Sequence, residues 1–194
     1  MGATKRKYRA PSGGFTLVEA LATVLVMALL LVLVAPTMGQ LIKRNKLVTL
    51  HTELRLSLGL ARTRAVETGA TVTVCPLWRG DRCAFPSGDW SRGWMVFEDP
   101  DRTGRCRDVG NGGVCQGTRN RILKIRPALE TGYVIRSNHH VSRRVRFFGT
   151  GMSYGSNGRF TLCDLGGAVR PVGLVLAATG RVRRARTSDL LSCP

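Results

Sequence analysis

The pattern of hydrophobic and polar positions divides the 194 residues into three stretches. Residues 1–14 are polar and basic, and residues 15–35 are apolar, with Glu19 as their only charge. About 20 apolar residues cross a bilayer core of roughly 30 Å as a helix, so residues 15–35 predict one transmembrane helix. The basic residues before this helix predict a cytoplasmic N-terminus, which places the rest of the chain outside.

Residues 36–68 have a helical repeat instead of a continuous apolar run. Leucines and alanines recur there every three or four positions, with charged residues between them. This spacing gives one apolar face, as in an amphipathic stalk helix. Gly69 suits the C-terminal cap of such a helix, so the sequence predicts one helix from about Phe15 to Thr68.

From residue 69 onward the apolar repeat shortens to two residues, which is typical of strands. Clusters of glycine, proline and asparagine separate the apolar runs. The predicted strands span residues 71–74, 94–98, 121–125, 133–136, 145–148, 159–163, 172–177 and 181–184. Residues 69–194 are therefore a β-rich head, and the predicted fold class is α+β, with a long helix packed on an antiparallel sheet.

Six cysteines all lie in the head. An even number there fits disulfides formed in an oxidising compartment such as the bacterial periplasm. Six cysteines allow fifteen pairings, and proximity along the chain favours one of them. Its pairs are Cys75 with Cys83, Cys106 with Cys115, and Cys163 with Cys193. The glycine-rich segment 100–117 is predicted to be a stapled surface loop rather than core.

The junction before the apolar stretch is unusual for a secretory signal. Small residues ending at Gly14 precede the apolar stretch, so cleavage there leaves the anchor on the mature chain. Glu19 places a carboxylate inside the predicted membrane helix, which costs about 3 kcal/mol and calls for a partner. The stretch GFTLVEALATVLVMALLLVLVAP, which begins at Gly14, resembles the class III signal of type IV prepilins and pseudopilins.

This resemblance implies processing and assembly. Prepilin peptidase would cut between Gly14 and Phe15, and the new N-terminus at Phe15 would be methylated. Glu19 would then be the fifth mature residue, which in the family meets the terminal amine of a neighbouring subunit, and such pairing avoids an unpaired buried charge. The implied location is the bacterial inner membrane, with one pass and a periplasmic head, followed by assembly with other pilin or pseudopilin subunits.

The head carries a second resemblance. Four stretches resemble, in this order, GspH/FimT-type pseudopilins: VTVCPLWRGDRC, WSRGWMVFEDPD, GRFTLCD and VGLVLAATGRVRRAR. The family contains GspH-like minor pseudopilins of type II secretion and FimT-like minor pilins of type IV pili, some of which bind DNA during natural transformation. A purely structural subunit, without DNA binding, is therefore the alternative to a FimT-like minor pilin.

The DNA-binding pattern GRxR of FimT-like proteins is matched near the C-terminus. The matching and extending residues are Gly180, Arg181, Arg183, Arg184 and Arg186. A turn at Thr179 and Gly180, followed by a strand, would put Arg181 and Arg183 on one side. Arg184 and Arg186 would share the inward face of Val182 unless the strand twists or ends. A net charge of +18, or +14 without the leader, favours polyanions. The predicted contacts are with DNA phosphates, without sequence specificity.

Arg143, Arg144 and Arg146 form a second basic cluster that could widen this surface. The adjacent Phe147 and Phe148 are predicted to belong to the core rather than to a base-stacking platform.

No residues suggest an enzyme, a metal site or a cofactor. His139 and His140, if on a strand, point to opposite faces, and Cys163 is better placed as a disulfide partner than as a nucleophile. Walker, GxSxG and HExxH patterns do not occur in the sequence. We therefore predict a protein that is not an enzyme.

Overall fold

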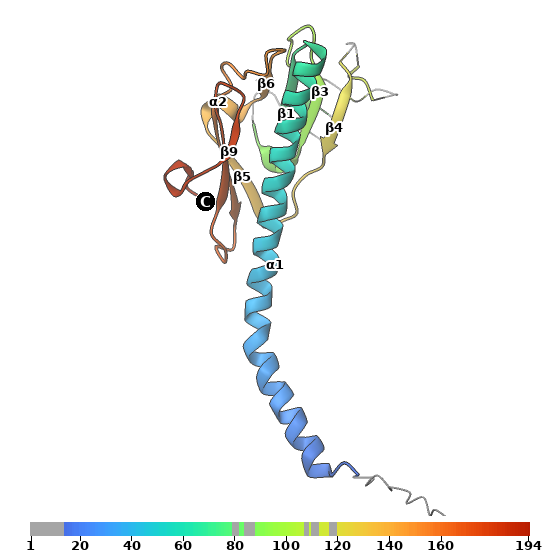
Figure 1. The fold of residues 1–194 in the computed structure, drawn as a ribbon, viewed down its shortest axis with the longest axis vertical. Coiled ribbons are helices and arrows are strands. Elements are labelled where there is room, and N and C mark those ends of the chain that lie inside the picture. Colours follow the sequence, from blue (N-terminus) through green and yellow to red (C-terminus); the bar gives the residue numbers. More distant parts are fainter. Residues whose placement is uncertain (1–13, 79–81, 84–87, 107–108, 110–112, 117–119) are drawn as a thin grey trace, which may run out of the picture. The chain divides into compact units, whose positions relative to one another are not determined.

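The first element, α1, is a helix of 52 residues, Leu17–Thr68 (Figure 1). A computed structural model describes residues 14–78, 82–83, 88–106, 109, 113–116 and 120–194, without the side chains at 33–36. The predicted leader therefore lies almost wholly outside the described residues. α1 begins two residues later than predicted because Thr16 acts as its cap, its Oγ1 accepting a hydrogen bond from the N–H of Glu19 at 3.3 Å.

The C-terminal end of α1 is formed by a glycine, as predicted. Gly69 has a φ of +65°, a left-handed conformation that L side chains rarely adopt. The hydroxyl of Thr68 donates to the carbonyl of Arg64 at 2.8 Å, which satisfies one carbonyl of the last turn. The chain then reverses directly into the first strand.

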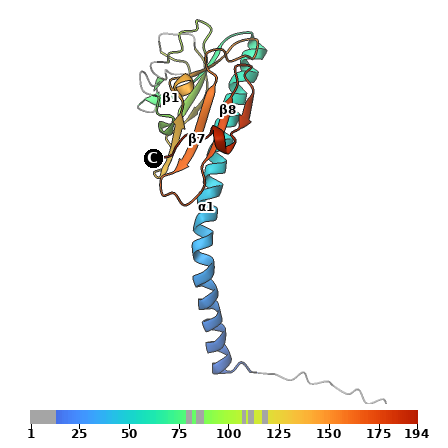
Figure 2. The same ribbon diagram turned by 90° about the vertical axis from the view of Figure 1, so that its left-hand side faces the viewer.

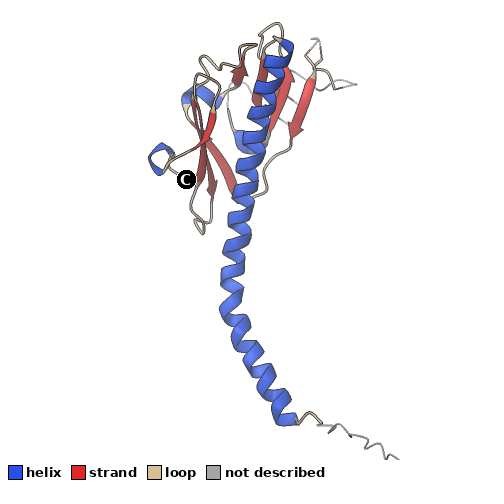
Figure 3. Ribbon diagram, in the orientation of Figure 1, coloured by secondary structure: helices blue, strands red, loops and turns tan. Residues whose placement is uncertain are grey.

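The chain divides into two units, Met1–Gly39 and Gln40–Pro194, and all the strands belong to the second. They form two antiparallel sheets instead of the single sheet predicted (Figure 3). The first sheet contains β1 (Val72–Trp78), β2 (Arg82–Cys83), β3 (Trp94–Glu98), β4 (Ile122–Arg126) and β6 (Val145–Phe147). The second contains β5 (Tyr133–Ser137), β7 (Gly158–Asp164), β8 (Val172–Leu176) and β9 (Val182–Arg184), paired in the order β5-β7-β8-β9.

The central strand of the first sheet is β1. One edge of β1 pairs with the whole of β3. The other edge of β1 pairs with β6 at the start of β1 and with β2 at the end of β1. The short helix α2 (His139–Ser142) connects β5 of the second sheet to β6 of the first. The switch between sheets occurs within a few residues, so the strand pattern alone could not separate one sheet from two.

Both sheets pack against the part of α1 that belongs to the second unit. Its buried leucines and alanines are Leu47, Leu50, Leu54, Leu58, Ala61 and Ala65. They contact apolar residues of both sheets, such as Val96 of β3 and Phe160 of β7. Two of the three tryptophans join this core: Trp94 donates from Nε1 to Ser57 Oγ at 2.9 Å, and Trp90 donates to the carbonyl of Val141 at 3.0 Å. The helical repeat therefore correctly predicted the face that is buried.

A second apolar cluster covers the other face of β1 and β3. It contains Cys75, Leu77, Met95, Phe97, Cys106 and Cys115. The prediction that segment 100–117 is surface loop rather than core was therefore wrong for its two cysteines, which are almost fully buried. A disulfide is apolar, and here it shields a sheet face that would otherwise be exposed. This also explains why six of the seven residues of β1 are buried rather than alternating.

All three predicted disulfides are confirmed. Cys75 bonds to Cys83, Cys106 to Cys115, and Cys163 to Cys193, with Cα–Cα separations of 5.5, 5.2 and 5.8 Å. The first two close short loops of the head. The third ties the C-terminus to β7.

Candidate functional site

The predicted basic hairpin consists of β8 and β9 at one edge of the second sheet (Figure 2 shows β8 beside β7). In its turn, the N–H of Ala177 donates to the carbonyl of Arg181 at 3.0 Å, and the N–H of Gly180 donates to the carbonyl of Ala177 at 2.9 Å. The turn that the sequence placed at Thr179 and Gly180 is confirmed.

Both the backbone conformation at position 180 and the atoms close to it require a glycine there. Its φ is +77°, and a Cβ at this position would lie 2.0 Å from the carbonyl oxygen of Gly151. Arg62 of α1 holds the same two segments, donating from Nε to the Gly151 oxygen at 3.1 Å and from Nη2 to the Thr179 oxygen at 3.4 Å. The glycine of the GRxR pattern therefore has a structural role, because it lets the turn lie against the loop at Gly151.

The register of the hairpin separates its arginines onto two faces. Arg184 lies opposite Leu174, a buried core residue, so it shares the helix side with Val182, as predicted. Arg183 lies on the outer side. All four arginines of the pattern are exposed: Arg181, Arg183, Arg184 and Arg186.

The tail after β9 places a carboxylate against the hairpin. The short helix η2, Thr187–Asp189, brings Asp189 Oδ2 to 2.8 Å from Arg183 Nη1. The backbone N–H of Arg186 donates to the same oxygen at 2.9 Å. These two hydrogen bonds, chiefly that from Arg183, hold the pKa of Asp189 below its usual value. Arg183 is thus compensated within the chain, whereas the other three arginines of the hairpin form no ion pair with any carboxylate that the structure describes.

The C-terminal tail that carries Asp189 lies on the outer face of the second sheet. The disulfide from Cys193 joins it to Cys163, and the N–H of Leu191 donates to Thr161 Oγ1 at 2.9 Å. Both Cys163 and Thr161 are fully buried as a result. The tail therefore keeps Asp189 in place beside Arg183.

On the helix side, the charge of Arg184 reaches α1. Burial lowers the pKa of His51, and the positive charges of Arg184 and Arg55 lower it further, whereas a backbone hydrogen bond at Gly173 raises it. The Nε2 atom of His51 is buried and has no hydrogen-bond partner within the described part of the chain. His51 therefore lies under a cationic edge that disfavours its protonation.

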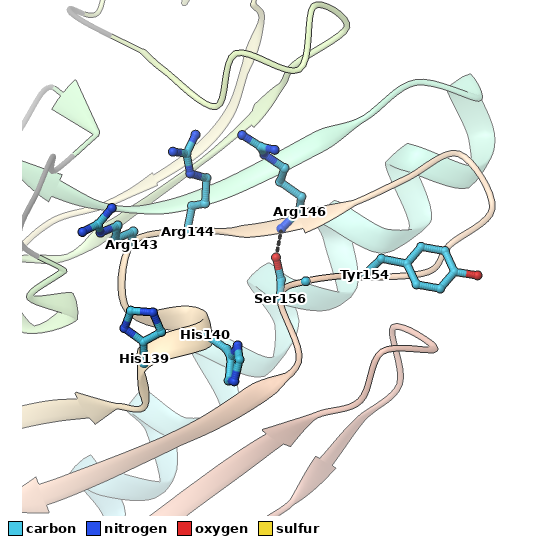
Figure 4. A pocket seen from close by; sticks show the side chains of 8 residues that line it. His139, His140, Arg143, Arg144, Arg146, Tyr154 and Ser156 are labelled. Carbon is cyan, nitrogen blue, oxygen red and sulfur yellow. Dashed lines mark hydrogen bonds between the residues drawn. The ribbon is translucent and has the colours of Figure 1, made fainter.

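The second basic cluster lines a hollow beside β6 (Figure 4). Its lining residues are His139, His140, Arg143, Arg144, Arg146, Tyr154, Gly155 and Ser156. Phe147 belongs to the buried core, as predicted. Phe148 is only half-buried, and the guanidinium of Arg102 lies 5.9 Å from its ring centre, so the prediction holds for one phenylalanine of the two.

Comparison with known proteins identifies the family. The sequence family described as type II transport protein GspH matches residues 52–180, which is more than half of the chain. The chain belongs to the GspH family. Its fold is similar to that of the Pseudomonas aeruginosa type IV minor pilin FimU, with a TM-score of 0.53 and 18% identity over 75% of this chain and 92% of that one.

A second crystal form of FimU gives a TM-score of 0.49 and 17% identity over 71% of this chain and 91% of that one. No curated protein matches the chain. The predicted resemblance to GspH/FimT-type, minor-pilin-like proteins and the predicted pilin-like α+β fold are both confirmed. The family and the fold are those of structural subunits, not of enzymes.

The N-terminal part of this GspH-family chain contains the predicted processing and assembly residues. Gly14 and Phe15 precede α1, and Glu19 lies exposed in its first turn. Among the described residues no single helix is both long and apolar enough to cross a bilayer, although Leu17–Val32 and Thr37–Thr68 meet that requirement as a pair. Cleavage, methylation and the pairing of Glu19 stay predictions.

The residues that could have suggested catalysis are not brought together. His139 and His140 lie on α2, between the predicted strands, and they line the basic hollow. Cys163 is bonded to Cys193, and the neighbouring Asp164 accepts hydrogen bonds from the backbone of the loop that follows it. Within the described ranges, no three His, Cys, Asp or Glu residues are placed to hold a metal ion.

Sequence reasoning missed two features of this GspH-family head. One is the ion pair between Arg183 and Asp189. The two residues are six positions apart, and this spacing alone did not indicate that they pair. The other is the convergence of histidines from α2, arginines before and within β6, and hydroxyl residues of a later loop on one hollow. The repeated arginines were a signal for the second feature, but the hollow depends on the tertiary structure.

Proposed function

We propose that this protein is a FimT-like minor type IV pilin whose C-terminal hairpin binds DNA phosphates and supports DNA uptake in natural transformation. The observation that carries the proposal is the hairpin itself: four exposed arginines lie on its turn, on β9 and just after β9, and α1 and the tail hold this segment in place. Guanidinium groups suit phosphate oxygens, because each group can donate two parallel hydrogen bonds.

The ion pair at Arg183 refines which arginines carry the proposed contacts. Arg183 already has a carboxylate partner. Binding a phosphate would require it to give up that partner, so Arg183 would contribute less binding free energy than an arginine without one. Arg181, Arg184 and Arg186 form no ion pair with a described carboxylate. Contacts of this kind read the backbone and not the bases, so affinity falls steeply with salt and depends little on sequence.

The test is a gel mobility shift with the full-length chain in non-ionic detergent and duplex DNA of unrelated sequences. A variant with Arg181→Gln, Arg184→Gln and Arg186→Gln should bind DNA at least about tenfold more weakly. The slope of the logarithm of its binding constant against the logarithm of salt concentration should become shallower by about one unit for each lost contact. A matched control, with Arg44→Gln, Arg136→Gln and Arg170→Gln, removes the same charge from exposed positions elsewhere. Equal losses in both variants would show that net charge, not the hairpin, binds DNA.

We also propose that the chain is processed and assembled as its N-terminal signal implies. Cleavage between Gly14 and Phe15, methylation of Phe15, and pairing of Glu19 with the terminal amine of a neighbouring subunit would anchor the protein in the inner membrane and then in a filament. Exposed apolar side chains along the first part of α1 support this proposal. Mass spectrometry of the protein from cells tests it, since an intact leader or an unmethylated Phe15 would contradict it.

The alternative function is that of a structural minor pseudopilin of type II secretion, which the GspH family match favours. It predicts that deleting the protein abolishes secretion or piliation while the hairpin variant behaves like the wild type in every assay. Under the DNA-binding proposal, the hairpin variant keeps piliation but loses transformation. The two functions are therefore separated by one variant assayed in two ways.

A further inference from the structure

Among the residues that the structure describes, the hollow beside β6 is lined by basic residues and by none that is acidic. It has a volume of about 340 Å³, and three arginines and two histidines contribute to its wall. Ser156 adds a hydroxyl group, whose Oγ accepts a hydrogen bond from the backbone N–H of Arg146 at 3.2 Å, whereas the Tyr154 hydroxyl points away from the arginines and donates to Met152 Sδ (Figure 4). A surface of this composition attracts anions and repels cations.

Two of the guanidinium groups are held side by side. A Cβ placed on Gly104 would lie 1.9 Å from Arg144 Nη1 and 2.8 Å from Arg146 Nη2, so both groups converge on the same backbone. Figure 4 shows the two side chains leaving the segment around β6 in the same direction. Gly104 has a φ of +63°, which also favours glycine here. The fold thus brings together two like charges that repel each other.

This repulsion is only partly compensated within the chain. Burial lowers the pKa of Arg144, and the charge of Arg146 lowers it further, while Asp99 acts in the opposite direction. Arg144 donates to the carbonyls of Thr103 and Gly104 at 3.1 and 3.3 Å. The Asp99 carboxylate accepts hydrogen bonds from neutral donors, including the hydroxyl of Thr73 at 2.8 Å. Neither Arg144 nor Arg146 forms an ion pair within the part of the chain that the structure describes.

Arg146 also has an unsatisfied donor. Its Nε is buried and lacks a hydrogen-bond partner among the described residues. A buried guanidinium N–H without an acceptor is unfavourable, because the group has lost water and gained nothing in return. An anion bound in the hollow would supply the missing acceptor.

We propose that this hollow is a phosphate-binding site. Phosphate carries several acceptor oxygens, so one group can accept from both adjacent guanidiniums and from a hydroxyl, and guanidinium groups match its geometry. The site is distinct from the β8–β9 hairpin and does not depend on DNA binding there. Its ligand is a phosphate group, carried either by a free phosphate compound or by a nucleic-acid backbone.

The site is tested by calorimetric titration of the full-length chain in non-ionic detergent with pyrophosphate. Arg146→Gln is the informative variant, because the Arg146 side chain makes no hydrogen bond in the described structure and its loss should leave the fold intact. It should weaken pyrophosphate binding by about tenfold, and Arg146→Lys, which keeps the charge but not the two-pronged geometry, should fall between the variant and the wild type. Arg170→Gln is the matched control for net charge and should bind like the wild type.

Two further titrations, with an oligonucleotide and with an acidic peptide, identify the source of the phosphate group and test a different class of ligand. A short single-stranded oligonucleotide that binds more tightly than pyrophosphate, and loses that affinity in Arg146→Gln, identifies the nucleic-acid backbone, whereas equal affinities identify a free phosphate compound. An acidic peptide that binds while pyrophosphate does not would overturn the proposal and identify a protein partner. Equal pyrophosphate affinities in Arg146→Gln, Arg170→Gln and the wild type would overturn it as well.

The proposed function can fail separately. If the hairpin variant still shifts DNA while Arg146→Gln loses pyrophosphate, the hollow is a phosphate site and the hairpin is not the DNA site. If the hairpin variant loses DNA binding while the wild type does not bind pyrophosphate, the hairpin is the DNA site and the hollow is not a phosphate site.

Discussion

The hairpin and the hollow both collect arginines, but they hold them in opposite ways. On the hairpin the arginines are exposed and spread along the chain, and one of them is neutralised by Asp189. In the hollow, Arg144 and Arg146 are half-buried and adjacent, and neither has an ion-pair partner among the described residues. An exposed row of cations provides a long-range, salt-sensitive field, whereas a crowded and partly desolvated pair provides a local site.

The comparison teaches that the number of arginines does not by itself locate a binding site. The hairpin has the larger number of arginines, yet its register and the C-terminal tail reduce its effective charge. The hollow has fewer, yet two of them converge beside Gly104. The following experiments test whether the two regions are independent.

The largest effect is expected from removing the disulfide that holds the tail. Cys163→Ser with Cys193→Ser opens a link across 30 residues and should lower the free energy of unfolding by about 3 to 4 kcal/mol. Urea unfolding of the full-length chain in detergent measures this. Below the unfolding transition, pyrophosphate binding in the hollow should stay unchanged, and a parallel loss there would show that the two regions are coupled.

The hairpin turn should be the next most sensitive position. Gly180→Ala imposes both an unfavourable φ and a clash with the Gly151 carbonyl, and should destabilise the head by about 2 to 3 kcal/mol. Gly167→Ala is the matched control, since its φ is +64° but a Cβ there meets nothing within 4 Å. It should cost about 1 kcal/mol. Equal unfolding free energies for the two variants would mean that the close approach to Gly151 is not important.

Releasing Arg183 should strengthen the hairpin without affecting the hollow. Asp189→Asn removes the carboxylate at 2.8 Å, so DNA affinity in the mobility shift should rise by about threefold to tenfold at low salt, with a steeper salt dependence. Glu130→Gln, which removes an exposed acid that pairs with Lys46, gives the same change in net charge. If both variants gain equally, the position of Asp189 has no special effect.

The smallest effect is expected in the pH dependence of stability. The pKa of His51 is lowered in the folded state, so the unfolded chain takes up the proton first as the pH falls. Its contribution to stability is thus complete above the unfolded pKa of about 6.5 and is lost as the pH falls through the folded value. Arg184→Gln should reduce this loss between pH 7.5 and 5.5 by less than about 1 kcal/mol. An unchanged pH profile in His51→Gln would show that other groups cause the loss.

Much of the fold could be predicted from local sequence features. The end of α1 at Thr68, the position of β3 and the hairpin turn each follow from residues within a few positions of one another. The disulfides were also predictable, because two of the three join cysteines separated by only 8 and 9 residues. Local steric preferences and short loop closures do not require knowledge of the rest of the chain.

Other features depend on contacts between distant segments. Arg62 holds the hairpin turn across 89 and 117 residues of sequence, and the strand pattern gave no sign of this contact. The division into two sheets depends on which strand edges meet after α2, which alternating side chains do not encode. Segment 100–117 was predicted to be a surface loop because its glycine content can be read from the sequence. The sheet face that its two cysteines cover cannot be read from the sequence.

The sequence by itself determined the long helix, the strands other than β2 and the family resemblance, and it favoured the cysteine pairs that form, because each rests on residue type and short-range spacing. Only the tertiary structure decided which arginines are compensated and which are crowded, because charge interactions depend on distances in space between residues that are far apart in the chain. The predicted hairpin was therefore found where expected, whereas the partner of Arg183 and the basic hollow were not foreseen.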